Sequence, residues 1–197
     1  MSASFCFAAI DFETTGSVSG YPVEPWQVGV AVIAPDAEPV FWDSLLRIGP
    51  RPFHPRAPGR HAALREELAA APTLMECLES LREYCGGVPM VAHNTATERN
   101  CLERGVPMER FGPWIDTLKL CRAAWPDLPS HRLEDLLTRF RLMDRVRAAF
   151  PDREPHDALF DAYGSAVLLT HLLGQPGWES VDLEVLTSPD TGAYYRK

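Results

Sequence analysis

The segment Ile10-Asp-Phe-Glu-Thr-Thr-Gly16 places two carboxylates at the end of a short apolar run that begins at Phe5. An uncharged apolar run of this length is typical of a strand buried on both faces, so residues 5–11 are predicted to form a central strand. Because side chains alternate along a strand, Asp11 and Glu13 are expected on one face, about 7 Å apart along the backbone. Two such carboxylates repel each other unless a cation, a shared proton or water offsets their charge.

The residues that follow favour a functional role for this pair over two solvated acids at a strand end. Thr14, Thr15 and Gly16 form a small, polar turn. The backbone amides of such a turn can meet a phosphate or a sugar. We therefore take these three residues as candidate substrate-binding residues.

A second group of titratable residues lies near the other end, in Pro155-His-Asp-Ala-Leu-Phe-Asp-Ala162. His156 and Asp161 are five residues apart, roughly 500° of helix rotation, so they cannot face one way from a single helix. His156 is predicted to lie in the loop or first turn, with Asp161 on the helix. One could then hold a metal ion while the other accepts a proton from water. Alternatively, His156 and Asp157 cap the helix and Asp161 is a surface charge.

The rest of the chain is patterned as strands first and then strands alternating with helices, which indicates a mixed α/β sheet with helices on its faces. Further strands are expected at residues 26–33, 40–48, 88–92 and 111–115. Helices are expected along the apolar stripe from Leu74 to Leu81 and at residues 95–104, 117–124, 131–140 and 158–173. A proline-rich loop over residues 49–59 is predicted to be an irregular connector or, less simply, a mobile active-site flap.

The length of 197 residues suits one domain, which we place at residues 1–174, followed by an irregular tail over residues 175–197 that packs on the domain or trails it. No apolar run is long enough to span a bilayer, and the stretch from Phe5 to Ile10 is too short for a signal-peptide core. A cytoplasmic protein without membrane contact is expected.

Charge and cysteine content argue against a wide duplex-binding surface and against a zinc- or disulfide-stabilised fold. The net charge of −8 argues against wide, sequence-independent binding of duplexes, but not against an enzyme that grips a strand end through bound cations. The five cysteines are scattered and form no C-x-x-C, so a zinc site or a disulfide framework is not expected.

Three motifs occur in a characteristic order: Asp11-x-Glu13-Thr-Thr-Gly16, His93-Asn94 after a strand, and His156-x-Ala-Leu-x-Asp161-Ala162. Together they resemble the DEDDh-type 3′–5′ exonucleases, a family that includes the proofreading epsilon subunit of bacterial DNA polymerase III. The resemblance spans residues 5–173. It implies an RNase H-like fold, with a five-stranded mixed sheet flanked by helices, and hydrolysis of nucleotides from a 3′ end.

The resemblance also implies a role for each site residue. The position of Asp11 bridges two metal ions, those of Glu13 and Asp161 complete the first metal site, and that of His156 activates the attacking water as general base. Oxygen-rich ligands suit Mg²⁺ or Mn²⁺ rather than zinc. Two such ions can clamp the attacking and leaving oxygens of an in-line displacement.

Other polar residues near the motifs are assigned mainly structural roles. Asn94 is a candidate substrate contact, but with His93 it more simply braces the end of its strand. Asp116 is predicted to be the N-cap of the helix at residues 117–124. Gln27 either lines the site or makes a hydrogen bond at the strand edge.

The fourth carboxylate of the family pattern is altered. Where the family has an aromatic residue followed by an aspartate, this chain has Thr97 and Glu98. Because the family aspartate usually approaches the metals through water, one extra methylene can be accommodated, and Glu98 is a candidate catalytic residue. Thr95 and Glu98 also match a capping box, in which Glu98 would instead reach back to the amide of Thr95.

Three functions are compatible with these motifs. The first is a 3′–5′ exonuclease on single-stranded DNA, alone or with a DNA polymerase in proofreading or repair. The second is an exoribonuclease or oligoribonuclease on short RNA, because sugar specificity depends on contacts to the 2′-hydroxyl that the sequence does not reveal. The third is a catalytically weak nucleic-acid-binding module, supported only by the changes at Thr97 and Glu98.

Overall fold

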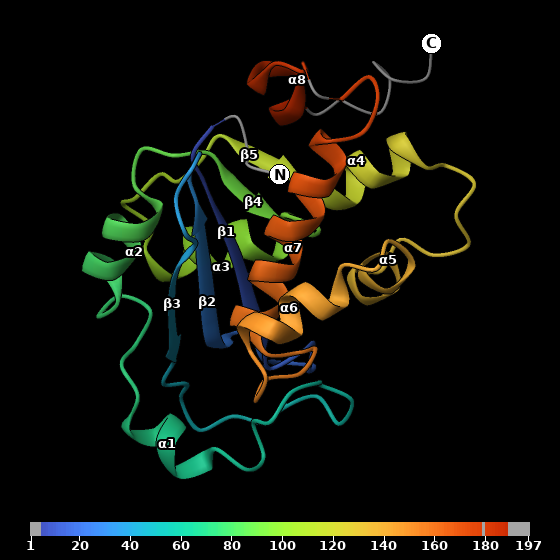
Figure 1. Ribbon diagram of the computed structural model, residues 1–197. Coiled ribbons are helices and arrows are strands. Elements are labelled where there is room, and N and C mark those ends of the chain that lie inside the picture. The colour runs from blue at the N-terminus through green and yellow to red at the C-terminus, as the bar shows by residue number, and fades with distance from the viewer. Residues whose placement is uncertain (1–4, 179, 189–197) are drawn as a thin grey trace.

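A computed structural model describes residues 5–178 and 180–188, and shows a central sheet with helices on both faces (Figure 1). The strands are β1 (Phe7–Thr14), β2 (Pro25–Ile33), β3 (Val40–Leu45), β4 (Met90–Ala92) and β5 (Trp114–Asp116). Their order is β3-β2-β1-β4-β5, with the first three strands antiparallel and with β4 and β5 parallel to β1. The predicted five-stranded mixed sheet is confirmed.

The helices divide the hydrophobic core between the two faces of the sheet. One face is covered by α2 (Leu78–Cys85) and α3 (Ala96–Gly105). The other face carries α4 (Thr117–Ala124), α5 (Leu133–Arg139), α6 (Met143–Ala149) and α7 (Ala158–Leu173), with α7 lying directly against β1 and β2 (Figure 1). Thirteen of the sixteen residues of α7 are buried, so this helix is the centre of the larger core.

Alternation along β1 assigns each of its side chains to one of these cores. Ile10 and Phe12 pack in the core under α2 and α3, whereas Phe7 and Ala9 pack in the core under α7. The next residues on the α7 side are Asp11 and Glu13. The predicted single face for the two carboxylates is therefore confirmed, and it is the face covered by α7.

Several predicted boundaries differ from the observed ones. The helices at residues 117–124 and 158–173 are confirmed with their bounds, but β1 extends to Thr14, so that both carboxylates lie inside the strand. Helix α2 begins at Leu78, four residues later than the apolar stripe, because Glu76 accepts hydrogen bonds from Thr73 in a separate turn.

Three short helices were not predicted: α1 (Arg65–Ala70), α6 (Met143–Ala149) and α8 (Leu183–Thr187). The irregular tail predicted for residues 175–197 is thus corrected, since α8 forms there and buries Leu186, while Trp178 is buried just before it. Residues 189–197 lie outside the described residues. Within the described ranges, no helix has both the length and the apolar character needed to cross a membrane.

A close approach between β2 and the start of α7 fixes the position of that helix. A Cβ atom on Gly29 would lie 2.2 Å from the backbone nitrogen of Leu159. Gly29 is also paired directly with Asp11 across the β1–β2 register. The absence of a side chain at Gly29 therefore lets the first turn of α7 rest on the strand beside Asp11.

Polar contacts hold the same helix end. The Gln27 amide donates to Asp157 Oδ2 at 2.9 Å, and its oxygen accepts from the Ala158 amide at 3.3 Å. Arg153 donates to Asp157 Oδ1 at 2.9 Å and, through both terminal nitrogens, to Asp43 on β3. The strand-edge hydrogen bond that was one alternative for Gln27 is therefore wrong, because its side chain bonds to the start of α7 instead.

Gly29→Ala is expected to destabilise the protein by about 1–3 kcal/mol, because the added methyl group must displace backbone of α7 rather than a flexible side chain. Urea unfolding followed by circular dichroism measures the change. Gly49→Ala is the control, since a Cβ at Gly49 meets no atom within 4 Å, and should stay within about 0.5 kcal/mol of wild type. Equal stability of the two variants would contradict the close packing of α7 on β2.

Candidate metal centre and catalytic site

Carboxylates from β1 and α7 converge at the end of β1. Glu13 is buried, with 5% of its surface exposed, and Asp11 is partly buried. Asp161 comes from the first turn of α7. The alternative interpretation of Asp161 as a surface charge is not supported, because its carboxylate lies beside Glu13 and accepts from the His156 amide.

His156 lies two residues before α7, in the loop position that the spacing predicted. Its φ of 68° is in the left-handed region, which is sparsely populated for a residue other than glycine. This conformation directs the His156 amide to Asp161 Oδ2, at 3.0 Å. Asp157 caps the helix by accepting from the amides of Leu159 and Phe160, so the helix cap and the histidine are separate features.

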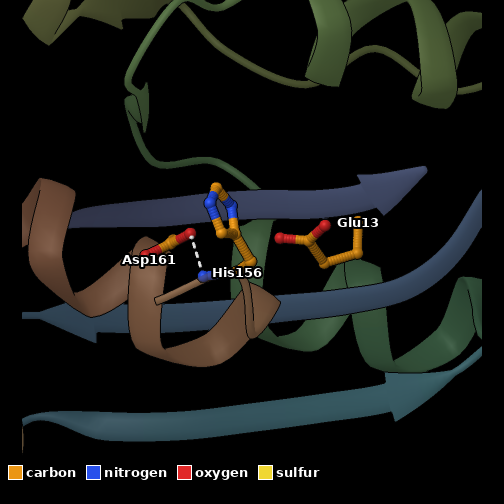
Figure 2. A group of neighbouring side chains, drawn as sticks. All are labelled: Glu13, His156 and Asp161. Carbon is orange, nitrogen blue, oxygen red and sulfur yellow. Dashed lines mark hydrogen bonds between the residues drawn. The ribbon is translucent and has the colours of Figure 1, made fainter. Parts of the chain in front are cut away.

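The side chains of Glu13, His156 and Asp161 form one cluster. Each offers a ligand atom, and these atoms all lie within 4.8 Å of one another. Figure 2 shows the Glu13 carboxylate directed from β1 toward His156 and Asp161 at the start of α7. The imidazole is half exposed, and its Nε2 atom lies 3.4 Å from Glu134 Oε1 on α5. Two carboxylates with an adjacent, solvent-accessible imidazole can hold a cation and accept a proton from water beside it.

Glu98 belongs to this acidic group and does not cap its helix. The amide and hydroxyl of Thr95 both donate to Asp116 Oδ2, at 3.3 Å and 3.2 Å, so the capping-box interpretation is wrong. Glu98 is 3% exposed, and its Oε2 atom has no hydrogen-bond partner among the described residues. A buried carboxylate oxygen without a partner is costly unless a cation or a proton is supplied.

The pKa values of all four carboxyl groups are raised, so holding four negative charges in this site is unfavourable. Burial raises the pKa of Glu13 to about 8, with further contributions from Asp161 and Asp157. Burial likewise raises the pKa of Glu98 to about 8 and that of Asp161 to about 7, the latter opposed by the His156 amide. Burial, and then the carboxylates of Asp161, Glu98 and Glu13, raise the pKa of Asp11 well above its ordinary value.

These observations fit a divalent metal centre. The donors are carboxylate oxygens with one imidazole, which suit Mg²⁺ or Mn²⁺. The unpartnered oxygen of Glu98 and the raised pKa values both indicate that a bound cation would stabilise the ionised carboxylates. Glu13, His156 and Asp161 offer ligand atoms to such an ion, and Asp11 and Glu98 lie near enough to one another for their charges to interact.

The predicted substrate-binding residues lie around this centre in different environments. Thr15 is buried, and its amide and hydroxyl both engage Glu24, so it fastens the turn rather than offering its amide to a ligand. Gly16 packs against His54 of the proline-rich loop. Asn94 is exposed, has a φ of 80°, and lines a cleft that also contains His156 and Asp161.

His93 and Asp116 have the structural roles that were predicted for them. The ring nitrogens of His93 contact Thr117 Oγ1 at 2.9 Å and the His131 carbonyl at 2.8 Å, and burial lowers its pKa. Asp116 accepts from the Lys119 amide as the N-cap of α4. The same carboxylate binds Thr95, and thereby fixes the start of α3 that carries Glu98.

Two neighbours of the site had no signal in the sequence. Glu134 approaches His156 from a separate helix 22 positions away in the chain, and only the fold brings them together. Likewise, the His54 amide donates to the Thr15 carbonyl at 2.8 Å, which makes the proline-rich loop a wall of the site. The capping role of Asp157, by contrast, was one of the alternatives that the sequence indicated, and it is confirmed.

The sheet order and the helices on both faces are those of the RNase H-like fold that was predicted, with the acidic centre at the start of α7. The chain belongs to the Exonuclease family (RNase_T), whose family model matches residues 8–169. The match includes Asp11, Glu13, Glu98, His156 and Asp161.

Individual proteins show the same relationship. The chain is 28% identical over 137 residues to Exodeoxyribonuclease 10 of Escherichia coli strain K12, covering 70% of this chain and 57% of that protein. It is 29% identical over 111 residues to the PolC-type DNA polymerase III of Bacillus subtilis strain 168, covering 54% of this chain and 7% of that protein. The structure of S. pombe Pop2p in its Mg²⁺- and Mn²⁺-bound form matches with a TM-score of 0.64 at 14% identity, over 92% of this chain and 88% of that one, a likeness of fold. The chain spans little more than half the length of Exodeoxyribonuclease 10.

Without metal, the protein is expected to lose stability as the pH rises from about 5 to 8. Glu13 and Glu98 titrate near 8 in the folded state, against an ordinary value of 4.5. The folded state therefore binds more protons than the unfolded chain across this interval, and the free energy of unfolding falls with rising pH. In EDTA, Tm should fall by about 4 °C or more between pH 5.5 and 8.0, and Mn²⁺ should restore most of the loss at pH 8.0.

The variant Glu98→Gln provides the comparison, because it removes one of the four carboxyl groups whose pKa is raised. Its Tm in EDTA should depend less on pH than that of the wild type. A wild-type Tm that rises over the same interval, or a variant with the same slope, would contradict the raised pKa of Glu98.

Proposed function

We propose that the chain is a divalent-metal-dependent 3′–5′ exonuclease that hydrolyses phosphodiester bonds at the 3′ end of single-stranded DNA. The observation that carries this proposal is the cluster of Glu13, His156 and Asp161 within 4.8 Å, with Asp11 and buried Glu98 beside it. Membership in the exonuclease family argues against a catalytically silent binding module. The presence of Asp11, Glu13, Asp161 and His156, with Glu98 in place of the fourth aspartate, argues against it as well.

Each residue of the cluster has a defined part in the proposed reaction. Asp11 is close enough to Glu13, Asp161 and Glu98 for their charges to raise its pKa. Asp11 would be shared by two metal ions, while Glu13 and Asp161 would complete one of the two sites. When bound, two Mg²⁺ or Mn²⁺ ions supply charge stabilisation to the attacking and leaving oxygens of an in-line displacement. The Mg²⁺- and Mn²⁺-bound form of Pop2p supports this choice of ions.

His156 is the proposed general base. It is half exposed and stands next to both carboxylates, so its imidazole can reach a water molecule that attacks the scissile phosphate. Its backbone amide is fixed to Asp161, which ties the position of the base to that of a metal ligand. Glu98 completes the negative charge around the ions.

DNA is the proposed substrate because the relative with the longer match is an exodeoxyribonuclease. The net charge of −8 further favours a strand end over a long duplex, since few lysines and arginines are available to neutralise a backbone. Association with a DNA polymerase, in proofreading or repair, is proposed from the similarity to the PolC-type polymerase.

Asp11→Asn should lower kcat at least about a thousandfold, because it removes the carboxylate that both proposed metal ions share. Glu98→Gln should lower kcat by a smaller factor, about tenfold, since Glu98 stands behind the three ligands. Release of labelled nucleotide from single-stranded DNA measures both rates, with Asp144→Asn on exposed α6 as control. Wild-type rates in Asp11→Asn would contradict the metal centre.

The wild-type protein with Mg²⁺ or Mn²⁺ should shorten a 5′-labelled single strand of DNA one nucleotide at a time. The products form a ladder that retains the 5′ label, and EDTA should abolish it. An RNA strand of the same sequence, run in parallel, tests the sugar. Faster shortening of RNA would overturn the DNA assignment, and loss of the 5′ label in a single step would overturn the 3′–5′ direction.

A further inference from the structure

A cleft of about 800 Å³ opens directly from the catalytic cluster, and three arginines line it. Arg56 comes from the proline-rich loop, Arg122 from α4 and Arg132 from the residue before α5. His156 and Asp161 line the same cleft, so the arginines and the catalytic cluster share one continuous space.

The guanidinium groups of these three arginines are not used in ion pairs among the described residues, in contrast to those of six other arginines. Arginines paired with a carboxylate are Arg47, Arg51, Arg82, Arg99, Arg147 and Arg153. By contrast, Arg56, Arg122 and Arg132 are exposed and have no carboxylate within ion-pairing distance in the part of the chain that the structure describes. Three guanidinium groups without a carboxylate partner therefore line the one cleft that also contains His156 and Asp161.

The chemistry of the cleft favours phosphate groups over bases. Guanidinium groups form two parallel hydrogen bonds with phosphate oxygens. The other lining residues include the apolar Leu118 and Leu133, the carboxylate of Glu134, and two histidines, His93 and His131, whose rings are hydrogen-bonded within the protein. The described lining contains no tryptophan, tyrosine or phenylalanine. Proteins that grip bases of a single strand use aromatic side chains as stacking platforms. Contacts to phosphates alone carry no sequence information.

We propose that Arg56, Arg122 and Arg132 bind the phosphates upstream of the scissile bond, so that the enzyme prefers strands of at least three nucleotides over a dinucleotide and has no base preference. This inference rests on the proposed exonuclease function, and deepens it by assigning the path of the strand. The scissile phosphate lies at the carboxylates, and the preceding phosphates lie along the arginines. A dinucleotide has no phosphate that reaches them.

The test compares kcat/KM, in Mn²⁺, for a thymidine dinucleotide and for a strand of twelve thymidines. Each single variant, Arg56→Gln, Arg122→Gln or Arg132→Gln, should lower the ratio of the 12-mer value to the dinucleotide value about threefold, and the triple variant about 30-fold. The slope of log(kcat/KM) for the 12-mer against log salt should become shallower by about 0.7 for each arginine removed.

Arg145→Gln is the matched control, because Arg145 is exposed on α6 and lines a separate pocket beside the β2–β3 turn, at the opposite end of the sheet. Its ratio and salt slope should equal those of the wild type. An unchanged ratio in the triple variant would overturn the proposal, since a cleft that holds only the terminal nucleotide affects both substrates alike.

Binding provides a second measurement that does not depend on turnover. Fluorescence anisotropy of a labelled 12-mer with Asp11→Asn, with and without the triple arginine change, should show weaker binding and a shallower salt dependence in the arginine variant. If the wild type cleaves neither substrate, the proposed exonuclease function fails, while anisotropy still decides the arginine proposal. If both substrates are cleaved and neither the ratio nor the anisotropy changes, only the arginine proposal fails.

Discussion

Repulsion among the carboxylates of Asp11, Glu13, Glu98 and Asp161 is the interaction around which this fold is arranged. Two full charges 4 Å apart repel by about 4 kcal/mol at an effective dielectric near 20, and here burial adds to that cost. The raised pKa values of all four groups are the visible result. Protons can relieve the repulsion at low pH, and divalent cations can relieve it at neutral pH. The acidic site is therefore expected to bind metal ions.

The surrounding structure holds these groups in place from outside. The bare backbone of Gly29 admits the start of α7, and the contacts of Gln27 and Asp157 lock that helix end against β2. On the other side, Asp116 anchors the turn before α3 and so directs Glu98 inward. The strained backbone of His156 is a further cost that the packed scaffold sustains. A rigid frame therefore keeps like charges together until ligands arrive.

Much of the fold could be predicted because its signals are local. The two-residue period of β1 places Asp11 and Glu13 on one face, and the long apolar run of α7 ends at Gly174, as observed. The short helices α1, α6 and α8 carry too few residues for a clear period. The capping-box prediction failed for a different reason. The spacing of Thr95 and Glu98 is a local signal, but the hydrogen-bond partner of Thr95 is Asp116, which lies on β5 and is distant in the sequence. The arginine cleft likewise exists only after folding.

The central claim is that the acidic cluster is a metal centre built to hold two ions. A crystal structure of the protein grown with Mn²⁺, with anomalous diffraction to locate manganese, tests it directly. The account predicts two manganese peaks at the cluster, with Asp11 contacting both ions and with Glu13 and Asp161 contacting one of them. Saturating Mn²⁺ with no anomalous peak at these residues, and with Glu98 still unpartnered, would contradict it.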